Sequence, residues 1–184
     1  MLTTPSKSSG FTLIELMIGI TIFALTLSLG VSSFRTWIQN TQIRNAAESI
    51  QLGIQRARAE AVKRNAEVKF VLQGTNPDWV ASWEVSTPTE TIESSSGREG
   101  SKNVSARGYD NGGNDVTTVT FSNLASVMSN ADASATLRRV ALDSTTLDAA
   151  DSRDLEVRIG LGGVGGNVRM CDPNLAAPNP MACN

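Results

Sequence analysis

The sequence has 184 residues, of which 16 are Lys or Arg, 18 are Asp or Glu and none is His. The absence of histidine removes the usual general base and the usual metal ligand, and it excludes the familiar Ser-His and Cys-His catalytic pairs. The slight acidic excess is not the charge balance of a general nucleic-acid-binding protein. The length suits one modest domain beside an N-terminal apolar segment.

That apolar segment covers residues 11–31, and Glu15 is its only charged member. As a helix, these 21 residues would extend roughly 31 Å, enough to cross the hydrocarbon core of a bilayer. A carboxylate in such a segment costs roughly 2.5–3.5 kcal/mol on insertion scales, so Glu15 requires a specific reason. A secretory signal peptide cleaved near residues 28–30 and a plain membrane anchor are the alternatives, and neither accounts for Glu15.

The helical pattern continues beyond the apolar segment. No proline occurs between residues 11 and 65, and residues 35–64 hold six basic and two acidic side chains. This basic excess predicts a solvated helix face, with a binding role as the alternative. Apolar or small side chains recur at steps of three and four, which predicts one face that packs on a domain. They are Phe34, Trp37, Ile38, Thr41, Ala46, Ala47, Ile50, Ile54, Ala57, Ala61 and Val62.

After residue 65 the pattern changes to the period of two that strands have. Residues 67–72 and 79–85 predict two strands around a turn at 74–78, with Trp79 and Trp83 in packing positions rather than on a stacking platform. Residues 86–103 lack periodicity and predict a surface loop or edge excursion. More strands are predicted at 104–107, 116–121, 135–143, 154–159 and 167–170, with turns at 110–115 and 160–166; Leu137 and Val140 differ in phase, which allows a bulge. The fold class is therefore α+β, a long helix packed on an antiparallel β domain.

The start of the apolar segment resembles the type IV pilin signature, because Gly10 is followed by Phe-Thr-Leu-Ile-Glu-Leu at residues 11–16. The resemblance implies that a prepilin peptidase cleaves after Gly10 and N-methylates Phe11, and that the new amine neutralises the Glu15 of a neighbouring subunit. It implies a leader peptide at 1–10, a transmembrane and filament-core helix at 11–33, an amphipathic continuation at 34–65 and a periplasmic β domain at 66–184. Before assembly the chain would cross the inner membrane once, and after assembly it would belong to the pilus.

Two further features are similar to the minor pilins and pseudopilins grouped as GspH, FimT and FimU. A basic helix runs directly into a strand near Asn65, and a Gly-rich hairpin leads to Arg-Met-Cys-Asp-Pro at residues 169–173, most like the FimU type. The resemblance implies a minor pilin, in or near the pilus tip, that helps prime assembly. Its partners would be other minor pilins and the major pilin through the N-terminal helix, the prepilin peptidase and the inner membrane. The alternatives are a DNA-binding FimT-type pilin for natural transformation and a GspH-type pseudopilin of a type II secretion system.

Cys171 and Cys183 are the only cysteines. The implied extracytoplasmic location predicts that they pair, whereas a redox or metal role would need further ligands. Asp110, Asn114 and Asp115 predict an ordinary tight turn, with a calcium site as the alternative. Because the sequence contains no nucleophile–base pair, phosphate-binding loop or metal cluster, we predict a protein that is not an enzyme and that uses neither a metal nor a cofactor.

The basic residues of the late strands include Arg138, Arg139, Arg158 and Arg169, which are the candidate contacts for DNA. The FimT-type resemblance implies a Gly-Arg-x-Arg motif on the last hairpin. Residues 165–169 read Gly-Gly-Asn-Val-Arg, so only one arginine of that motif is in place. Phosphate contact needs several cations that act together, and the sequence therefore favours the structural role over DNA binding.

Overall fold

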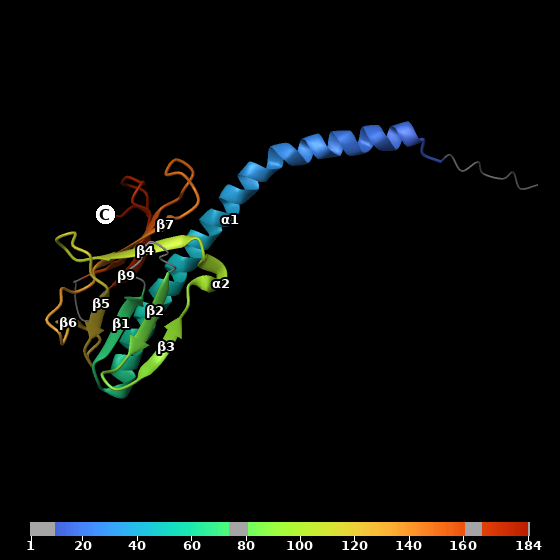
Figure 1. Ribbon diagram of the computed structural model, residues 1–184. Helices are drawn as coiled ribbons and strands as arrows, with labels where there is room; N and C mark the ends of the chain where they lie inside the picture. Colours follow the sequence, from blue (N-terminus) through green and yellow to red (C-terminus); the bar gives the residue numbers. More distant parts are fainter. Residues whose placement is uncertain (1–9, 74–80, 161–166, 184) are drawn as a thin grey trace, which may run out of the picture. The chain divides into compact units, whose positions relative to one another are not determined.

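The computed structural model describes residues 10–73, 81–160 and 167–183 (Figure 1). Its longest element is helix α1, Leu13–Arg64. By its contacts the chain divides into two units, Met1–Arg35 and Thr36–Asn184, and all strands belong to the second. No helix in the described part of the chain combines the length and apolar character needed to cross a membrane.

The end of α1 has a local cause. Asn65 adopts a positive φ of 51°, a left-handed conformation that asparagine tolerates better than most residues. The backbone N–H of Ala66 then donates to the carbonyl of Ala61 (3.2 Å) and that of Asn65 donates to the carbonyl of Val62 (3.2 Å). These bonds satisfy carbonyls that the helix end would leave unpaired, so the chain leaves the helix directly into the first strand.

Two antiparallel sheets follow. The five-stranded sheet has the order β3-β2-β1-β5-β6, built from β1 (Val68–Gln73), β2 (Ser82–Ser86), β3 (Thr91–Ser95), β5 (Thr118–Phe121) and β6 (Val127–Met128). The four-stranded sheet has the order β4-β7-β8-β9, built from β4 (Val104–Tyr109), β7 (Arg139–Ser144), β8 (Leu155–Ile159) and β9 (Val168–Cys171). The α+β class predicted from the sequence is therefore confirmed.

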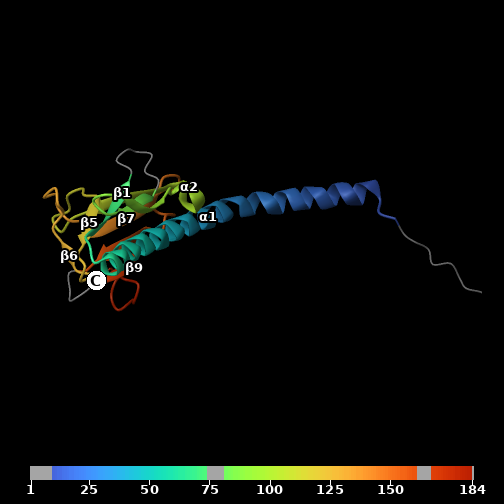
Figure 2. The same cartoon turned by 90° about the horizontal axis from the view of Figure 1, so that it is seen from below.

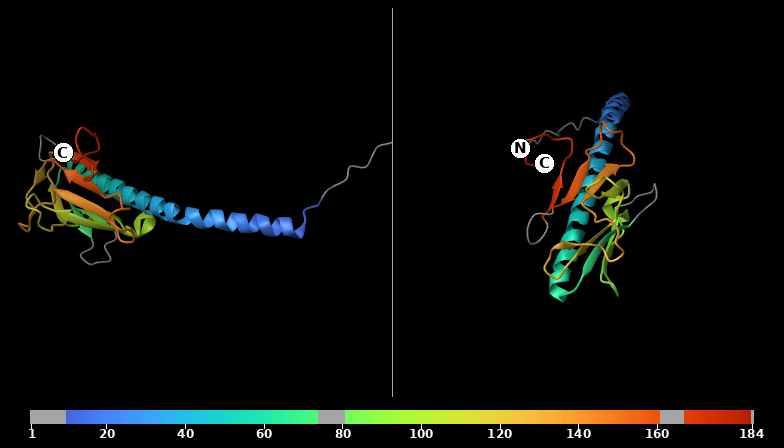
Figure 3. Two further views of the ribbon diagram at one scale, coloured as in Figure 1. Left: turned by 90° about the horizontal axis from the view of Figure 1, so that it is seen from above. Right: turned by 90° about the vertical axis from the view of Figure 1, so that its left-hand side faces the viewer.

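One apolar cluster joins the second half of α1 to both sheets. Helix residues Ile43, Ile50 and Ile54 are fully buried with Phe70 of β1 and Val140 of β7. Figure 2 shows this half of α1 lying along the strands, and Figure 3 shows it from two other sides. The predicted stripe is buried from Ala46 to Ala61, where it packs on the sheets. Four members of the same stripe are exposed instead, which corrects the prediction toward its two ends: Phe34, Trp37, Thr41 and Val62.

The region from 86 to 103 differs from the predicted loop. It contains β3 and a short helix α2 (Arg98–Ser101). Strand β3 pairs with β2 through its backbone, with Glu93 opposite Val85. Because β3 is an edge strand and most of its side chains are exposed, it forms without the apolar alternation on which the sequence prediction depended. The two-residue strand β6 was likewise not predicted.

The other predicted strands form, with shifted ends. Strand β7 begins at Arg139, because Leu137 lies in the preceding connection, where its N–H donates to the carbonyl of Thr118 in the other sheet (2.8 Å). The phase difference between Leu137 and Val140 therefore reflects a change of sheet and not a bulge. Trp79 and the turns predicted at 74–78 and 160–166 lie wholly or mostly outside the described residues.

Candidate functional sites

The N-terminal segment exposes every large apolar side chain that the structure describes between residues 11 and 27. These side chains are Phe11, Leu13, Ile14, Leu16, Met17, Ile18, Ile20, Ile22, Phe23, Leu25 and Leu27. An apolar surface of this extent on a regular helix marks a site of contact with lipid or with other proteins.

Glu15 lies in the first turn of α1, among these exposed side chains. Its backbone N–H donates to Oγ1 of Thr12 (3.3 Å), so Thr12 caps the helix start. No ion pair of the Glu15 carboxylate is found within the described residues. Gly10 and Phe11, the predicted cleavage and methylation positions, are exposed just before the helix.

The basic side chains of the second half of α1 pair largely with acidic side chains of the same chain. Glu60 is only 2% exposed, and it forms ion pairs with Arg56 (3.5 Å), Lys63 (3.3 Å) and Arg64 (2.8 Å). The hydrogen bond from Arg64 lowers the pKa of Glu60 below its usual value. This part of the helix face is therefore held by intramolecular ion pairs.

The candidate DNA contacts converge in the four-stranded sheet. Arg139 of β7 lies directly opposite Arg158 of β8, and Arg158 lies directly opposite Arg169 of β9. We call these three residues the arginine ladder. Side chains of directly opposed residues project from the same face of a sheet, and like charges in this arrangement repel. The sheet register thus brings together three cations that are 19 and 11 residues apart in sequence.

A cavity of about 570 Å³ lies at this ladder. It is lined by all three ladder arginines, by Arg138, and by the turn at residues 110–113. Arg138 is half-buried, its Nη1 atom has no hydrogen-bond partner within the described residues, and burial lowers the pKa of its guanidinium. Asp110 is the acidic residue of the lining. The cavity therefore has a predominantly cationic wall.

The Asp110 carboxylate is occupied by its own turn. It accepts hydrogen bonds from the N–H of Gly112 (2.7 Å), the N–H of Asn114 (2.9 Å) and the Nδ2 of Asn114 (2.9 Å). The bond from the Asn114 side chain contributes most to lowering the pKa of Asp110. This geometry is that of the predicted tight turn.

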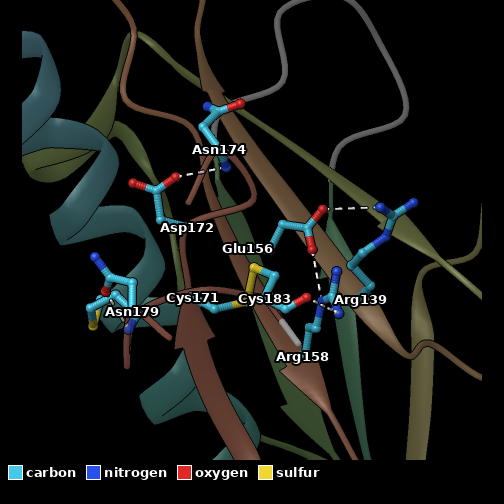
Figure 4. Close-up of a disulfide and its surroundings, with 9 residues drawn as sticks. Arg139, Glu156, Arg158, Cys171, Asp172, Asn174, Asn179 and Cys183 are labelled. Atoms are coloured by element: carbon cyan, nitrogen blue, oxygen red, sulfur yellow. Dashed lines mark hydrogen bonds and ion pairs between the residues drawn. A yellow bond between two sulfur atoms is a disulfide. The ribbon is translucent and has the colours of Figure 1, made fainter. Parts of the chain in front are cut away.

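Glu156 forms ion pairs with two of the ladder arginines, Arg139 and Arg158. This side chain is 5% exposed; its Oε1 accepts from Nη1 of Arg139 (3.0 Å) and its Oε2 accepts from Nε of Arg158 (2.8 Å), as Figure 4 shows. The Arg139 guanidinium also lies over the Tyr109 ring, 4.6 Å from its centre. A buried carboxylate with two arginines fixes the orientation of both guanidinium groups.

The two cysteines are joined by a disulfide, Cys171–Cys183, which closes the C-terminal loop. Nη1 of Arg158 donates to the carbonyl oxygen of Cys183 (3.0 Å), so the loop end contacts the arginine ladder directly (Figure 4). Both sulfur atoms also lie within 4.8 Å of a Glu156 oxygen. The two thiols are consumed by the disulfide, and this cluster is therefore not arranged as a metal site in this structure. Sequence reasoning did not single out Glu156, because its role depends on the strand register.

The chain matches two models of known protein families. Residues 5–31 match the prokaryotic N-terminal methylation motif, and residues 46–177 match the family model described as type II transport protein GspH. A long N-terminal helix, antiparallel sheets and a methylation motif define a protein of the type IV pilin and pseudopilin class. The chain belongs to the GspH family within that class.

Two solved structures are similar, both of the type IV minor pilin FimU from Pseudomonas aeruginosa PAO1. The structure in space group P21 has 15% sequence identity and a TM-score of 0.47, and covers 77% of this chain and 95% of that chain. The structure in space group P65 has 16% identity and a TM-score of 0.45, and covers 77% and 99% respectively. No curated protein matches the chain.

Proposed function

We propose that this protein is a minor pilin that enters a type IV pilus at or near its tip and helps to prime assembly. The observation that carries the proposal is the exposed apolar surface of residues 11–27 with a single carboxylate, Glu15, in the first helical turn. Burial of each large apolar side chain contributes about 1.5–3 kcal/mol, which suits a helix that packs among other helices. The other minor pilins and the major pilin are the proposed partners, reached through this helix.

In this proposal, Glu15 favours the assembled filament over the isolated subunit in the membrane. Before assembly, residues 11–33 would lie in the inner membrane with the β domain in the periplasm. There a single subunit offers its carboxylate only its own new amine at Phe11 and the helix N-terminal dipole, the latter worth about 0.3–1 kcal/mol. The cost of a charge at the bilayer centre, roughly 2.5–3.5 kcal/mol, is larger. The amine at Phe11 of a neighbouring subunit, created when the prepilin peptidase cleaves after Gly10, would neutralise the carboxylate within the filament.

Glu15→Leu tests this role. The variant is expected to be processed and inserted at least as well as the wild type, but to be recovered poorly in sheared pili and in co-purification with other pilins. Glu67→Leu, which removes an exposed carboxylate from the β domain, serves as the matched control and should assemble normally. Undiminished incorporation of Glu15→Leu would remove Glu15 from the assembly mechanism.

A place in a type II secretion system is a second candidate, favoured by the description of the matched family. The apolar helix and Glu15 would act in the same way in a secretion pseudopilus. Deletion of the gene distinguishes the two: loss of surface pili supports the minor pilin, and loss of secreted enzymes with intact pili supports the pseudopilin.

Binding of DNA is a third candidate, favoured by the arginine ladder. The wall formed by the ladder and Arg138 offers several guanidinium groups within one cavity, and arginine binds phosphate oxygens in a bidentate manner. Arg169→Gln should weaken binding of duplex DNA by the full chain in detergent and reduce the salt dependence by about one unit. Arg44→Gln, on the exposed helix face, is the charge-matched control. Equal binding by both variants would exclude the ladder as the contact.

A further inference from the structure

The three guanidinium groups of the arginine ladder need neighbouring acceptors that offset their mutual repulsion. Three like charges in direct cross-strand register repel one another, and Glu156 is the carboxylate that pairs with two of them, Arg139 and Arg158. Arg158 lies in the middle of the ladder. Besides its ion pair with Glu156, it donates a hydrogen bond to the carbonyl oxygen of Cys183. The position of Arg158 therefore depends on where the end of the C-terminal loop lies.

The disulfide and a set of hydrogen bonds fix the end of that loop. The N–H of Asp172 donates to the carbonyl of Met181 (2.7 Å), the N–H of Ala182 donates to the carbonyl of Asn179 (3.0 Å), and the N–H of Asn174 donates to the Asp172 carboxylate (2.9 Å). The disulfide adds a covalent tie between Cys183 and the end of β9. The disulfide thus ties Cys183, and with it the Cys183 carbonyl, to β9, the strand that carries Arg169.

We propose that the C-terminal disulfide loop is a positioning element of a phosphate-binding site formed by the arginine ladder. The Cys171–Cys183 bond fixes the Cys183 carbonyl, that carbonyl and Glu156 together orient Arg158, and Glu156 in turn orients Arg139. The loop thereby aims two guanidinium groups into the cavity at which Arg138 and Arg169 also lie. This inference rests on the DNA-binding candidate proposed above and adds the element that positions its arginines.

A purely stabilising role is the alternative for the C-terminal disulfide loop. A loop that only stabilised the domain would not need an acceptor aimed at a cavity arginine. Arg153 provides the internal comparison, because its Nε pairs with Asp172 at the base of the loop (3.3 Å) but the residue does not line the cavity. Arg153 and Arg158 are thus two loop-contacting arginines of equal charge, of which one belongs to the proposed site.

The experiment measures binding of a fluorescein-labelled 20-base-pair DNA duplex to the full chain in non-ionic detergent, at several salt concentrations. Arg158→Lys keeps the charge and the disulfide but cannot hold Glu156 and the Cys183 carbonyl with one planar group. We expect Arg158→Lys to bind the duplex about tenfold more weakly, because a hydrogen bond to a charged group typically has that strength. Arg153→Lys should bind as the wild type does. Equal behaviour of the two lysine variants would overturn the proposal.

A double-mutant cycle separates positioning from general stability. The disulfide is removed by replacing both cysteines, Cys171→Ser with Cys183→Ser, in the wild type and in Arg158→Gln. Removal should weaken binding and lower the salt slope by about one unit in the wild type only, because Arg158 carries the effect. An equal loss in the Arg158→Gln background, or no loss in either, would overturn the proposal.

Calorimetry with inorganic pyrophosphate separates failure of the inference from failure of DNA binding. If the wild type binds pyrophosphate but not the duplex, and Arg158→Lys weakens that binding, the site takes small phosphates and the DNA candidate falls while the loop's role stands. If the duplex binds and the loop variants do not alter its binding, the DNA candidate stands and the inference falls. If neither probe binds, both fall.

Discussion

Trp83 occupies the space that a side chain at Gly53 would need. A Cβ atom on Gly53 would lie 2.8 Å from Cδ2 and from Cε2 of the Trp83 ring, and 2.9 Å from Cε2 of Phe70. The two rings stack with centres 5.9 Å apart, and the Trp83 indole N–H donates to Oγ of Ser49 one turn earlier in α1 (3.0 Å). The glycine therefore sets how closely α1 approaches the five-stranded sheet.

Gly53→Ala should destabilise the domain. Overpacking of this kind costs about 1–3 kcal/mol, and the gain in helix propensity offsets up to about 1 kcal/mol of it. We expect a net loss of about 1–2 kcal/mol in the free energy of unfolding, measured by urea titration of Trp fluorescence. Gly19→Ala, where a new Cβ meets no atom within 4 Å, is the matched control in the same helix. A variant as stable as the wild type would show that the helix can move away from the sheet.

Glu60→Gln should lower stability in a pH-dependent manner. The pKa of Glu60 is lowered from an ordinary value of 4.5 in the folded protein, chiefly by the Arg64 hydrogen bond. Its stabilising contribution is therefore present above pH 4.5 and is lost as the pH falls through the folded value. Urea midpoints at pH 7 and pH 3 should show a difference between wild type and variant that shrinks at pH 3. Glu48→Gln, an exposed member of a single ion pair, should change the midpoint less. A pH-independent difference would contradict this account.

Asp154→Asn should raise stability at neutral pH. Burial raises the pKa of Asp154, and the hydrogen bond with Asp143 and the repulsion between the two carboxylates raise it further. The Oγ atom of Ser152 lies between the two carboxylates, 2.8 Å from that of Asp143 and 3.1 Å from that of Asp154. Because the folded state favours the protonated form, stability falls as the pH rises from the ordinary value of 3.8 through the folded value. The amide should remove this loss, so thermal melts are expected to be higher than wild type at pH 7 and similar near pH 3. Asp151→Asn, an exposed acid on the same loop, should have no such effect.

Gly10→Ala should leave an unprocessed precursor. Gly10 precedes the helix and lies within the matched methylation motif, where a residue without a side chain leaves the peptidase unobstructed. Intact mass spectrometry should give the full chain for the variant and a chain beginning at methylated Phe11 for the wild type. Gly19→Ala should be processed normally. A Gly10→Ala product that still begins at Phe11 would show that Gly10 does not determine cleavage.

Local features of the chain are those that the sequence alone determined. The apolar segment with Glu15, the end of the helix near Asn65, the alternation at β1 and β8 and the β-branched residues of β5 are each carried by residues close together in sequence, and their physics is local. The strand β3 escaped prediction because an edge strand is held by its backbone pairing with β2, and backbone pairing leaves little trace in the side-chain pattern.

Only the tertiary structure decided the arrangement of the arginines. In sequence, Arg139, Arg158 and Arg169 are scattered, and the last hairpin carries one arginine of the FimT-type motif. The register of β7, β8 and β9 places them opposite one another. A shift of one residue in that register would send the side chains of the shifted strand to the other face of the sheet. The role of Glu156 and the contact of Cys183 with Arg158 depend on the same register. Long-range pairing is set by how the two sheets and α1 share one core, and that is a property of the whole domain.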